Sequence, residues 1–262
     1  MELNEMNYFS HEADMEYFSA SQIKSFKKCE AKTMAQLNGL YLRDMSTALM
    51  VGQYVDAALT GDLDEWCGCH PEIKKRDGSL KAEFMQASEM VGRANRDPLF
   101  MSFMEGEHQA ILKAPILGGY WFKAKFDVLG PDKIVDLKTV KDLKSQYLPG
   151  QGRVDFATAW DWPLQMAIYQ KIYEEVEGIR LPCYLAVITK ETPADIRIVQ
   201  IEQERMDAEI AWLEQVLPRY EAVKSGAIDP ERCEVCEWCR ESRVLMGPEL
   251  LGDFDENGGI AE

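Results

Sequence analysis

Two aspartates and a lysine lie on a predicted β-hairpin, and their types and spacing suit metal-assisted hydrolysis. Residues 118–129 and 134–139 alternate with a period of two, and a Gly-Pro-Asp-Lys turn signal separates them. If the hairpin is symmetric about this turn, Asp127 faces Asp136 across the strands. Directly opposed like charges destabilise a strand pair, whereas a divalent cation between them prefers such oxygen ligands. Asp127 and Asp136 are therefore predicted to bind a hard metal, with Lys138 beside them on the same face.

This combination suits the hydrolysis of a phosphodiester. A bound metal activates water, and the Lys138 ammonium orients that water or stabilises charge in the transition state. The alternative interpretation of the same residues is a solvated strand face, on which Asp136 and Lys138 form a surface ion pair.

A longer pattern extends the argument. The segment FD-x(8)-DLKT, followed by a helix with Gln165 and Tyr169 four residues apart, resembles the PD-(D/E)xK nuclease superfamily. Within it, the chain is most similar to RecB-like and RecE-like (exonuclease VIII) phage recombination nucleases. The resemblance covers roughly residues 19–240 and is strongest over 118–173.

The resemblance implies an α/β fold with a restriction-endonuclease-like core, in which helices flank a central mixed β-sheet. It also implies Mg²⁺ or Mn²⁺ as the cofactor. Its residues are carried over as the metal ligands Asp127, Asp136 and the backbone carbonyl of Leu137, the water-activating Lys138, and the supporting Gln165 and Tyr169.

Two more metal ligands are expected from the resemblance. Asp56 lies where the related families have Gly-x-x-x-His, and a carboxylate binds magnesium or manganese as well as an imidazole does. The alternative is a solvated or capping aspartate. Glu107, on a predicted strand at 107–114, corresponds to a glutamate before the hairpin in RecE-like proteins, and the alternative is an exposed residue at a strand edge.

A second cluster of metal-ligating residues lies near the C-terminus. Cys233, Cys236 and Cys239 form C-x2-C-x2-C, and three thiols within seven residues indicate a metal site. Cys29 completes a set of four if the first predicted helix packs against the C-terminus. The pattern resembles AddB-type and CRISPR-adaptation nucleases, which hold a [4Fe–4S] cluster, although their last spacing is usually longer. A [4Fe–4S] cluster, zinc and no metal all remain open.

The net charge of −16 is unusual for a DNA-binding protein. Residues 123–153, however, carry seven basic and four acidic side chains, which makes the predicted site locally basic. A narrow basic channel would admit the end of a linear DNA molecule, whereas the alternative is a chance distribution. The predicted DNA-binding residues are Lys123, Lys125, Lys141, Lys144 and Arg153.

The chain is divided into a polar N-terminal arm over residues 1–18, a nuclease domain over 19–245, and an acidic tail over 246–262 that is predicted to be disordered. A loop with free thiols is expected at Cys67-Gly-Cys69-His70. The expected strands lie near 107–114, 120–129, 133–140, 183–190 and 195–202, and the expected helices at 20–39, 46–60, 80–93, 162–177 and 204–217.

Bulk properties predict a globular protein without a membrane partner. Of the 262 residues, 46% are hydrophobic and 28% charged, and no apolar run approaches the roughly 18 residues of a membrane span. The first residues lack the basic and apolar regions of a secretion signal, so the cytoplasm of a bacterium, or of one carrying a phage or prophage, is expected. Seven cysteines argue against a disulfide framework there. A homo-oligomer is compatible with these properties.

The predicted function is a metal-dependent DNA exonuclease of phage recombination type, working with a single-strand annealing recombinase. One alternative is a single-strand exonuclease of the CRISPR-adaptation type with an iron–sulfur cluster, which the cysteines favour. The other is a non-catalytic module that binds DNA ends and has a decayed nuclease core. Asp56 in place of histidine favours decay, whereas the intact Asp127, Asp136 and Lys138 argue against it.

Overall fold

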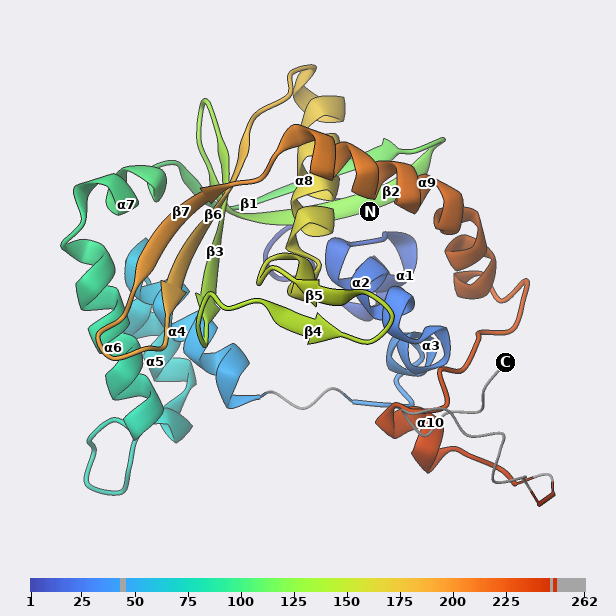
Figure 1. Ribbon diagram of the computed structural model, residues 1–262, viewed down its shortest axis with the longest axis horizontal. Helices are drawn as coiled ribbons and strands as arrows, with labels where there is room; N and C mark the ends of the chain where they lie inside the picture. Colours follow the sequence, from blue (N-terminus) through green and yellow to red (C-terminus); the bar gives the residue numbers. More distant parts are fainter. Residues whose placement is uncertain (43–45, 246, 249–262) are drawn as a thin grey trace.

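A five-stranded mixed sheet forms the centre of the computed structural model, which describes residues 1–42, 46–245 and 247–248 (Figure 1). The strand order is β1-β2-β3-β6-β7, with β3 and β6 parallel and the other neighbours antiparallel. The predicted α/β class with a central mixed sheet is confirmed. The strands are β1 (Glu107–Ile116), β2 (Tyr120–Leu129), β3 (Ile134–Val140), β6 (Cys183–Thr189) and β7 (Ile196–Gln200).

The parallel pair β3–β6 requires a crossover connection, because parallel strands cannot be joined by a tight turn. The connection contains the small hairpin β4 (Gln146–Leu148) and β5 (Gly152–Val154), the short helix η2 (Thr158–Trp160) and α8 (Trp162–Glu177). Both strands are almost entirely buried, as expected for strands covered on two faces.

Two hydrophobic cores, one on each face of the sheet, make the molecule three-layered (Figure 1). Helices α2 (Ala20–Lys28), α8 and α9 (Gln203–Lys224) cover one face. Helices α4 (Thr47–Thr60), α6 (Ala82–Asn95) and α7 (Pro98–Phe103) cover the other. Asp136 therefore lies on a central strand between two helical layers.

Several helix boundaries follow from local signals. The Ser46 hydroxyl accepts a hydrogen bond from the Leu49 N–H (3.2 Å) and caps α4, which ends at Gly61 with φ 95°. The helix expected at 204–217 is longer than predicted, since α9 continues through Pro218 to Lys224. Its buried side chains keep helical spacing past the proline, so packing outweighs the lost hydrogen bond.

The predicted single helix at 20–39 is in fact two helices. The chain leaves the helical region at Cys29 (φ −169°, ψ 110°), and α3 (Glu30–Leu37) begins there, with Cys29 Sγ accepting the Lys32 N–H. The predicted loop at Cys67–His70 is also wrong. Cys67 and Cys69 lie in α5 (Leu63–Cys69), which is followed by η1 (Pro71–Ile73).

The predicted N-terminal arm over 1–18 is part of the packed fold. Residues His11–Glu16 form α1, and Tyr17 and Phe18 are buried. Phe18 forms a bridge to β2, donating its N–H to Trp121 O and accepting the Lys123 N–H, both at 2.8 Å. The many charged residues of this segment indicate a polar arm, and its few apolar side chains give no clear sign that they enter the core.

The predicted acidic tail over 246–262 lies outside the described residues, apart from 247–248. The last described helix is α10 (Glu237–Glu241), which lies beside α3 in Figure 1. Among the helices that the structure describes, none is both long enough and apolar enough to cross a membrane.

Candidate active site

Asp127 and Asp136 come from the β2–β3 hairpin, whose register is the predicted one. Val128 pairs with Val135, as symmetry about the turn requires. Beyond this pair, Asp127 Oδ2 accepts a hydrogen bond from the Leu137 N–H at 2.9 Å. The side chain of Asp127 thus takes the place of a backbone acceptor on the neighbouring strand, which holds its carboxylate beside β3.

Asp136 is 1% exposed and is held from both sides. Its Oδ1 accepts a hydrogen bond from Gln165 Nε2 at 2.7 Å, and its Oδ2 forms an ion pair with Lys138. Lys24 of α2 donates to Gln165 Oε1 at 2.7 Å. A continuous polar chain therefore runs from Lys24 through Gln165 and Asp136 to Lys138, and it fixes the orientation of the Asp136 carboxylate.

Asp56 reaches the same site from α4. A Cβ on Gly52, one turn earlier, would lie only 3.5 Å from Thr139 Oγ1, so α4 passes close over β3. Asp56 Oδ2 accepts a hydrogen bond from Gln109 Nε2 at 2.9 Å. Asp56 Oδ1 is buried and has no hydrogen-bond partner among the described residues.

The electrostatics of the site show that its carboxylates interact. Burial, together with the charge of Asp136, raises the pKa of Asp56 to about 6, although His108 and Lys125 oppose this shift. Burial and the charge of Asp136 raise the pKa of Asp127 well above its usual value. Several negative charges in one buried place are unfavourable unless further positive charge joins them.

This donor set fits a divalent cation. Magnesium and manganese prefer carboxylate and carbonyl oxygens, and Asp56 Oδ1 is a buried oxygen left without a donor. The residues that would hold the ion are Asp56, Asp127, Asp136 and the Leu137 carbonyl. Asp56 in the place of a histidine keeps the site suitable for such an ion.

Lys138 is a cation at neutral pH. Burial works against its charge, but Asp136 and Asp127 outweigh burial, so the pKa of Lys138 is raised. The pKa of Lys24, by contrast, is lowered to about 7 by burial and by the charge of Lys138. Lys24 is a site residue that sequence reasoning missed, because its helix lies more than 100 positions before Asp136.

Tyr169 lies one helical turn after Gln165 on α8, as predicted. Its ring packs 4.9 Å from the ring of Phe126. Burial and the charge of Asp136 raise the pKa of Tyr169 well above its usual value, so the phenol stays neutral. Tyr169 thus forms part of the wall behind the carboxylates.

The structure does not bring Glu107 to the site. Glu107 is exposed and pairs with Leu129 near the turn of the β2–β3 hairpin. Gln109, two residues later, has φ 56° and reaches Asp56 instead. The period-two pattern places Glu107 and Gln109 on one strand face, but it does not indicate which of them lies nearer the site.

A cavity of about 910 Å³ opens onto these residues. Asp56, Asp127 and Lys138 line it, together with further residues of α4 and of the connection after β3. Its aromatic lining comes from Phe156, Trp160 and Trp162.

Four of the five predicted DNA-binding residues are at least partly accessible, and they lie in three different places. Lys141 and Lys144 are exposed and line the cavity. Lys125 is half-buried, and its charge reaches Asp56. Arg153 is exposed on β5 and donates to Ser145 Oγ at 3.3 Å.

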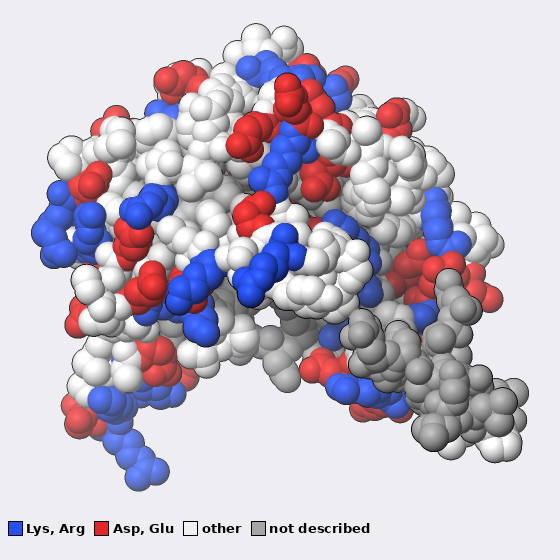
Figure 2. Space-filling model, in the orientation of Figure 1, with Lys and Arg blue, Asp and Glu red and all other residues white. Residues whose placement is uncertain are grey.

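Lys123 is the exception, and its predicted DNA contact is wrong. It is 1% exposed, and its Nζ donates to Asp14 Oδ1 at 2.7 Å and to the carbonyl oxygen of Tyr8. On the face seen in Figure 2, basic and acidic side chains are intermingled, and the basic side chains do not form a continuous surface.

The predicted meeting of Cys29 with Cys233, Cys236 and Cys239 is confirmed. Their four sulfur atoms all lie within 4.8 Å of one another, although Cys29 precedes the sheet and the other three follow it. The described residues thus contain a second candidate metal centre. Its ligand atoms would be sulfur, whereas those of the first centre would be oxygen.

An Asp from one strand, an Asp-x-Lys from the next and a Gln-x-x-x-Tyr helix behind them define a PD-(D/E)xK nuclease fold with a restriction-endonuclease-like core. The sequence matches the family described as "PDDEXK-like domain of unknown function (DUF3799)" over residues 19–242. The chain belongs to this family, and the suspected superfamily is confirmed.

A solved structure supports the same conclusion. The chain is similar to a protein from Eubacterium rectale described as a "Putative exonuclease", with 38% identity and a TM-score of 0.93. The match covers 98% of this chain and 99% of that one. No protein of curated function matches the sequence. These similarities support a nuclease hydrolase.

Proposed function

We propose that this protein is a metal-dependent exodeoxyribonuclease that hydrolyses phosphodiester bonds at DNA ends. The observation that carries the proposal is that Asp56, Asp127 and Lys138 line one cavity, with Lys138 paired to the buried Asp136 directly behind it. An intact set of carboxylates and a paired lysine is not expected of a decayed nuclease core.

The metal-ligand residues, Lys138 and Gln165 have separate roles in this proposal. Asp56, Asp127, Asp136 and the Leu137 carbonyl would hold Mg²⁺ or Mn²⁺, which supplies water activation and neutralises charge on the phosphate. Lys138, which is paired with Asp136, donates hydrogen bonds to the water or to the charged oxygens. Gln165 holds the Asp136 carboxylate in one orientation.

The size of the cavity supports cleavage at the end of a DNA strand. About 910 Å³ is typical of a site for a small molecule, so the cavity suits a few nucleotides of one strand rather than a duplex. Lys141 and Lys144 at its rim would contact the backbone phosphates of that strand.

A cleavage assay tests the proposal. With Mg²⁺ or Mn²⁺ we expect end-labelled linear DNA to be degraded, and covalently closed circles to resist. EDTA should abolish cleavage, and so should Asp127→Asn, whereas Asp132→Asn on the exposed hairpin turn should retain it. Equal cleavage of closed circles would contradict the proposed exonuclease activity. No cleavage of any DNA would contradict nuclease activity altogether.

A single-strand exonuclease is the second candidate, and the aromatic lining favours it. Trp160 is 51% exposed in the short helix η2 beside the cavity. Asp155 anchors that helix by accepting the N–H groups of Ala157 and Thr158, both at 2.9 Å. Exposed aromatic rings on fixed supports stack unpaired bases with little sequence preference. A role in recombination, with a single-strand annealing partner, rests on the resemblance to RecE-like enzymes.

Replacing Trp160 with alanine tests this candidate. Stacking contributes roughly 1–3 kcal/mol per base, so we expect kcat/KM on single-stranded DNA to fall by about 5- to 150-fold, mainly through KM. Trp121→Ala, which removes an exposed tryptophan from β2 outside the cavity, is the matched control. An unchanged KM in Trp160→Ala would show that bases do not stack there.

A further inference from the structure

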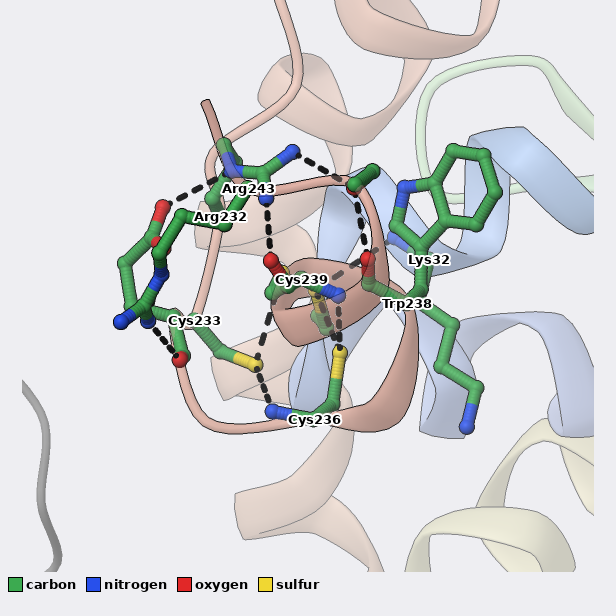
Figure 3. A network of polar contacts seen from close by, with 10 residues as sticks. Lys32, Arg232, Cys233, Cys236, Trp238, Cys239 and Arg243 are labelled. Carbon is green, nitrogen blue, oxygen red and sulfur yellow. Dashed lines mark hydrogen bonds and ion pairs between the residues drawn. The ribbon is translucent and has the colours of Figure 1, made fainter. Parts of the chain in front are cut away.

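The four-cysteine centre joins two segments that are far apart in the chain. Cys29 lies between α2 and α3, and the other three cysteines lie on and before α10 (Figure 3). The segments are also joined directly, since the Ala31 N–H donates to Glu231 O at 2.9 Å. Glu30, which is buried, accepts bonds from the Glu231 N–H and from Arg219.

The separations of the sulfurs match those around a single ion. Cys29 and Cys239 are 3.6 Å apart, Cys29 and Cys236 are 3.8 Å apart, and Cys233 and Cys239 are 4.0 Å apart. Four sulfurs bound tetrahedrally to zinc at about 2.3 Å lie about 3.8 Å from one another. The remaining pairs, within 4.8 Å, need to move by less than about 1 Å to reach that value.

A [4Fe–4S] cluster requires a wider arrangement. Its four thiolates bind four different irons, so the sulfurs are separated by the body of the cluster in addition to the iron–sulfur bonds. The sulfur separations in this structure, all within 4.8 Å, leave no room for the body of a cluster.

The surroundings suit a thiolate centre. Cys29, Cys233 and Cys236 each accept a backbone N–H, at 3.4, 3.3 and 3.4 Å respectively. Cys29 and Cys239 are buried. Arg232 donates to the carbonyl oxygen of Cys239 at 2.7 Å (Figure 3), and its Nε pairs with Glu234 at 2.8 Å. A tetrathiolate zinc centre carries two negative charges, and the three backbone N–H groups direct partial positive charge at its sulfurs.

We propose that Cys29, Cys233, Cys236 and Cys239 bind one zinc ion as a closed structural site, which clamps the α2–α3 junction to the C-terminal segment. With four protein ligands, the ion keeps no open position for substrate, as is typical of structural zinc. Among the described residues that line the active-site cavity, none is one of these cysteines. The clamp directly follows α2, the helix whose Lys24 donates to Gln165.

Metal analysis of the purified protein, prepared with excess Mg²⁺, tests the proposal. We expect one zinc per chain and no acid-labile sulfide. Cys236→Ser should lose the zinc, whereas Cys69→Ser, which alters an exposed cysteine of α5, should keep it. Asp127→Asn should also keep it, which separates this centre from the carboxylate site and from the proposed nuclease activity. Four irons with four sulfides per chain would overturn the proposal, and so would zinc retained in Cys236→Ser.

A second measurement needs no variant and applies if Cys236→Ser does not fold. Titration of the wild-type protein with an organic mercurial, followed with a zinc-sensitive dye, should release the zinc in step with the modification of four thiols. Cobalt substitution should give the intense visible bands of a tetrahedral tetrathiolate. Zinc that is absent, or released before any thiol reacts, would show that the cysteines do not hold it.

Discussion

Replacing Lys138 with methionine is expected to lower the rate of DNA cleavage by about 10²- to 10⁴-fold, the range for removal of a positioned donor or proton-transfer group. Lys138 is the cation paired with the buried Asp136, and Asp127 also supports its charge. Methionine keeps much of the side-chain volume and removes the charge. The loss should appear in kcat, because the ammonium acts on charge that develops during the reaction.

The stability of the Lys138→Met variant needs a separate control. Removing one partner of a buried ion pair costs about 3–5 kcal/mol when the other charge stays uncompensated, as Asp136 would in metal-free protein. Cleavage is therefore compared with saturating Mg²⁺ at a temperature where circular dichroism shows both proteins folded. Lys171→Met, on the surface of α8, is the matched control. A folded Lys138→Met protein with the wild-type rate would exclude a catalytic role for Lys138.

The second large effect is expected at the N-terminal segment. Asp14→Ala should lower the free energy of unfolding by about 3 kcal/mol, because it leaves the ammonium of Lys123 buried without its carboxylate. This is the low end of the range for buried pairs, since the side chain of Asp14 is 37% exposed and solvent screens part of the interaction. Urea unfolding measures the change directly.

The dependence on pH follows from the pKa of Lys123. Burial lowers it, and Asp14 opposes that shift, so Asp14→Ala should lower it further. A lysine whose pKa is lower in the folded state costs stability while it is protonated, and the cost disappears as the pH rises past the unfolded pKa. The deficit of Asp14→Ala should therefore be full at neutral pH and smaller above about pH 10.

Two variants complete this experiment. Asp132→Ala removes an exposed carboxylate that is paired with Lys133, and it should change stability by about 0.5 kcal/mol or less. Asp14→Ala combined with Lys123→Met should recover much of the loss, because removing both members of a buried pair is often tolerated. A stability of Asp14→Ala equal to that of wild type would show that residues 1–18 are an arm after all.

Local patterns in the sequence were sufficient to predict the β2–β3 hairpin. Period-two alternation and one turn signal predicted the register in which Val128 pairs with Val135, and hence the closeness of Asp127 to Asp136. The helix at 162–177, which carries Gln165, was predicted for similar reasons, from its proline start and its apolar spacing. These features depend on residues close together in the chain, where backbone geometry leaves few alternatives.

Contacts between distant segments were decided only by the tertiary structure. Whether Gln109 or Glu107 reaches Asp56 depends on where α4 crosses β1 and β3, and Lys24 reaches Gln165 only because α2 packs against α8. Lys123 lies on the polar face of an alternating strand, yet residues 8–18 cover that face and bury it. Side-chain types and spacing determine which face of an element is polar, whereas packing between elements determines whether that face meets solvent, a metal ion or another part of the chain.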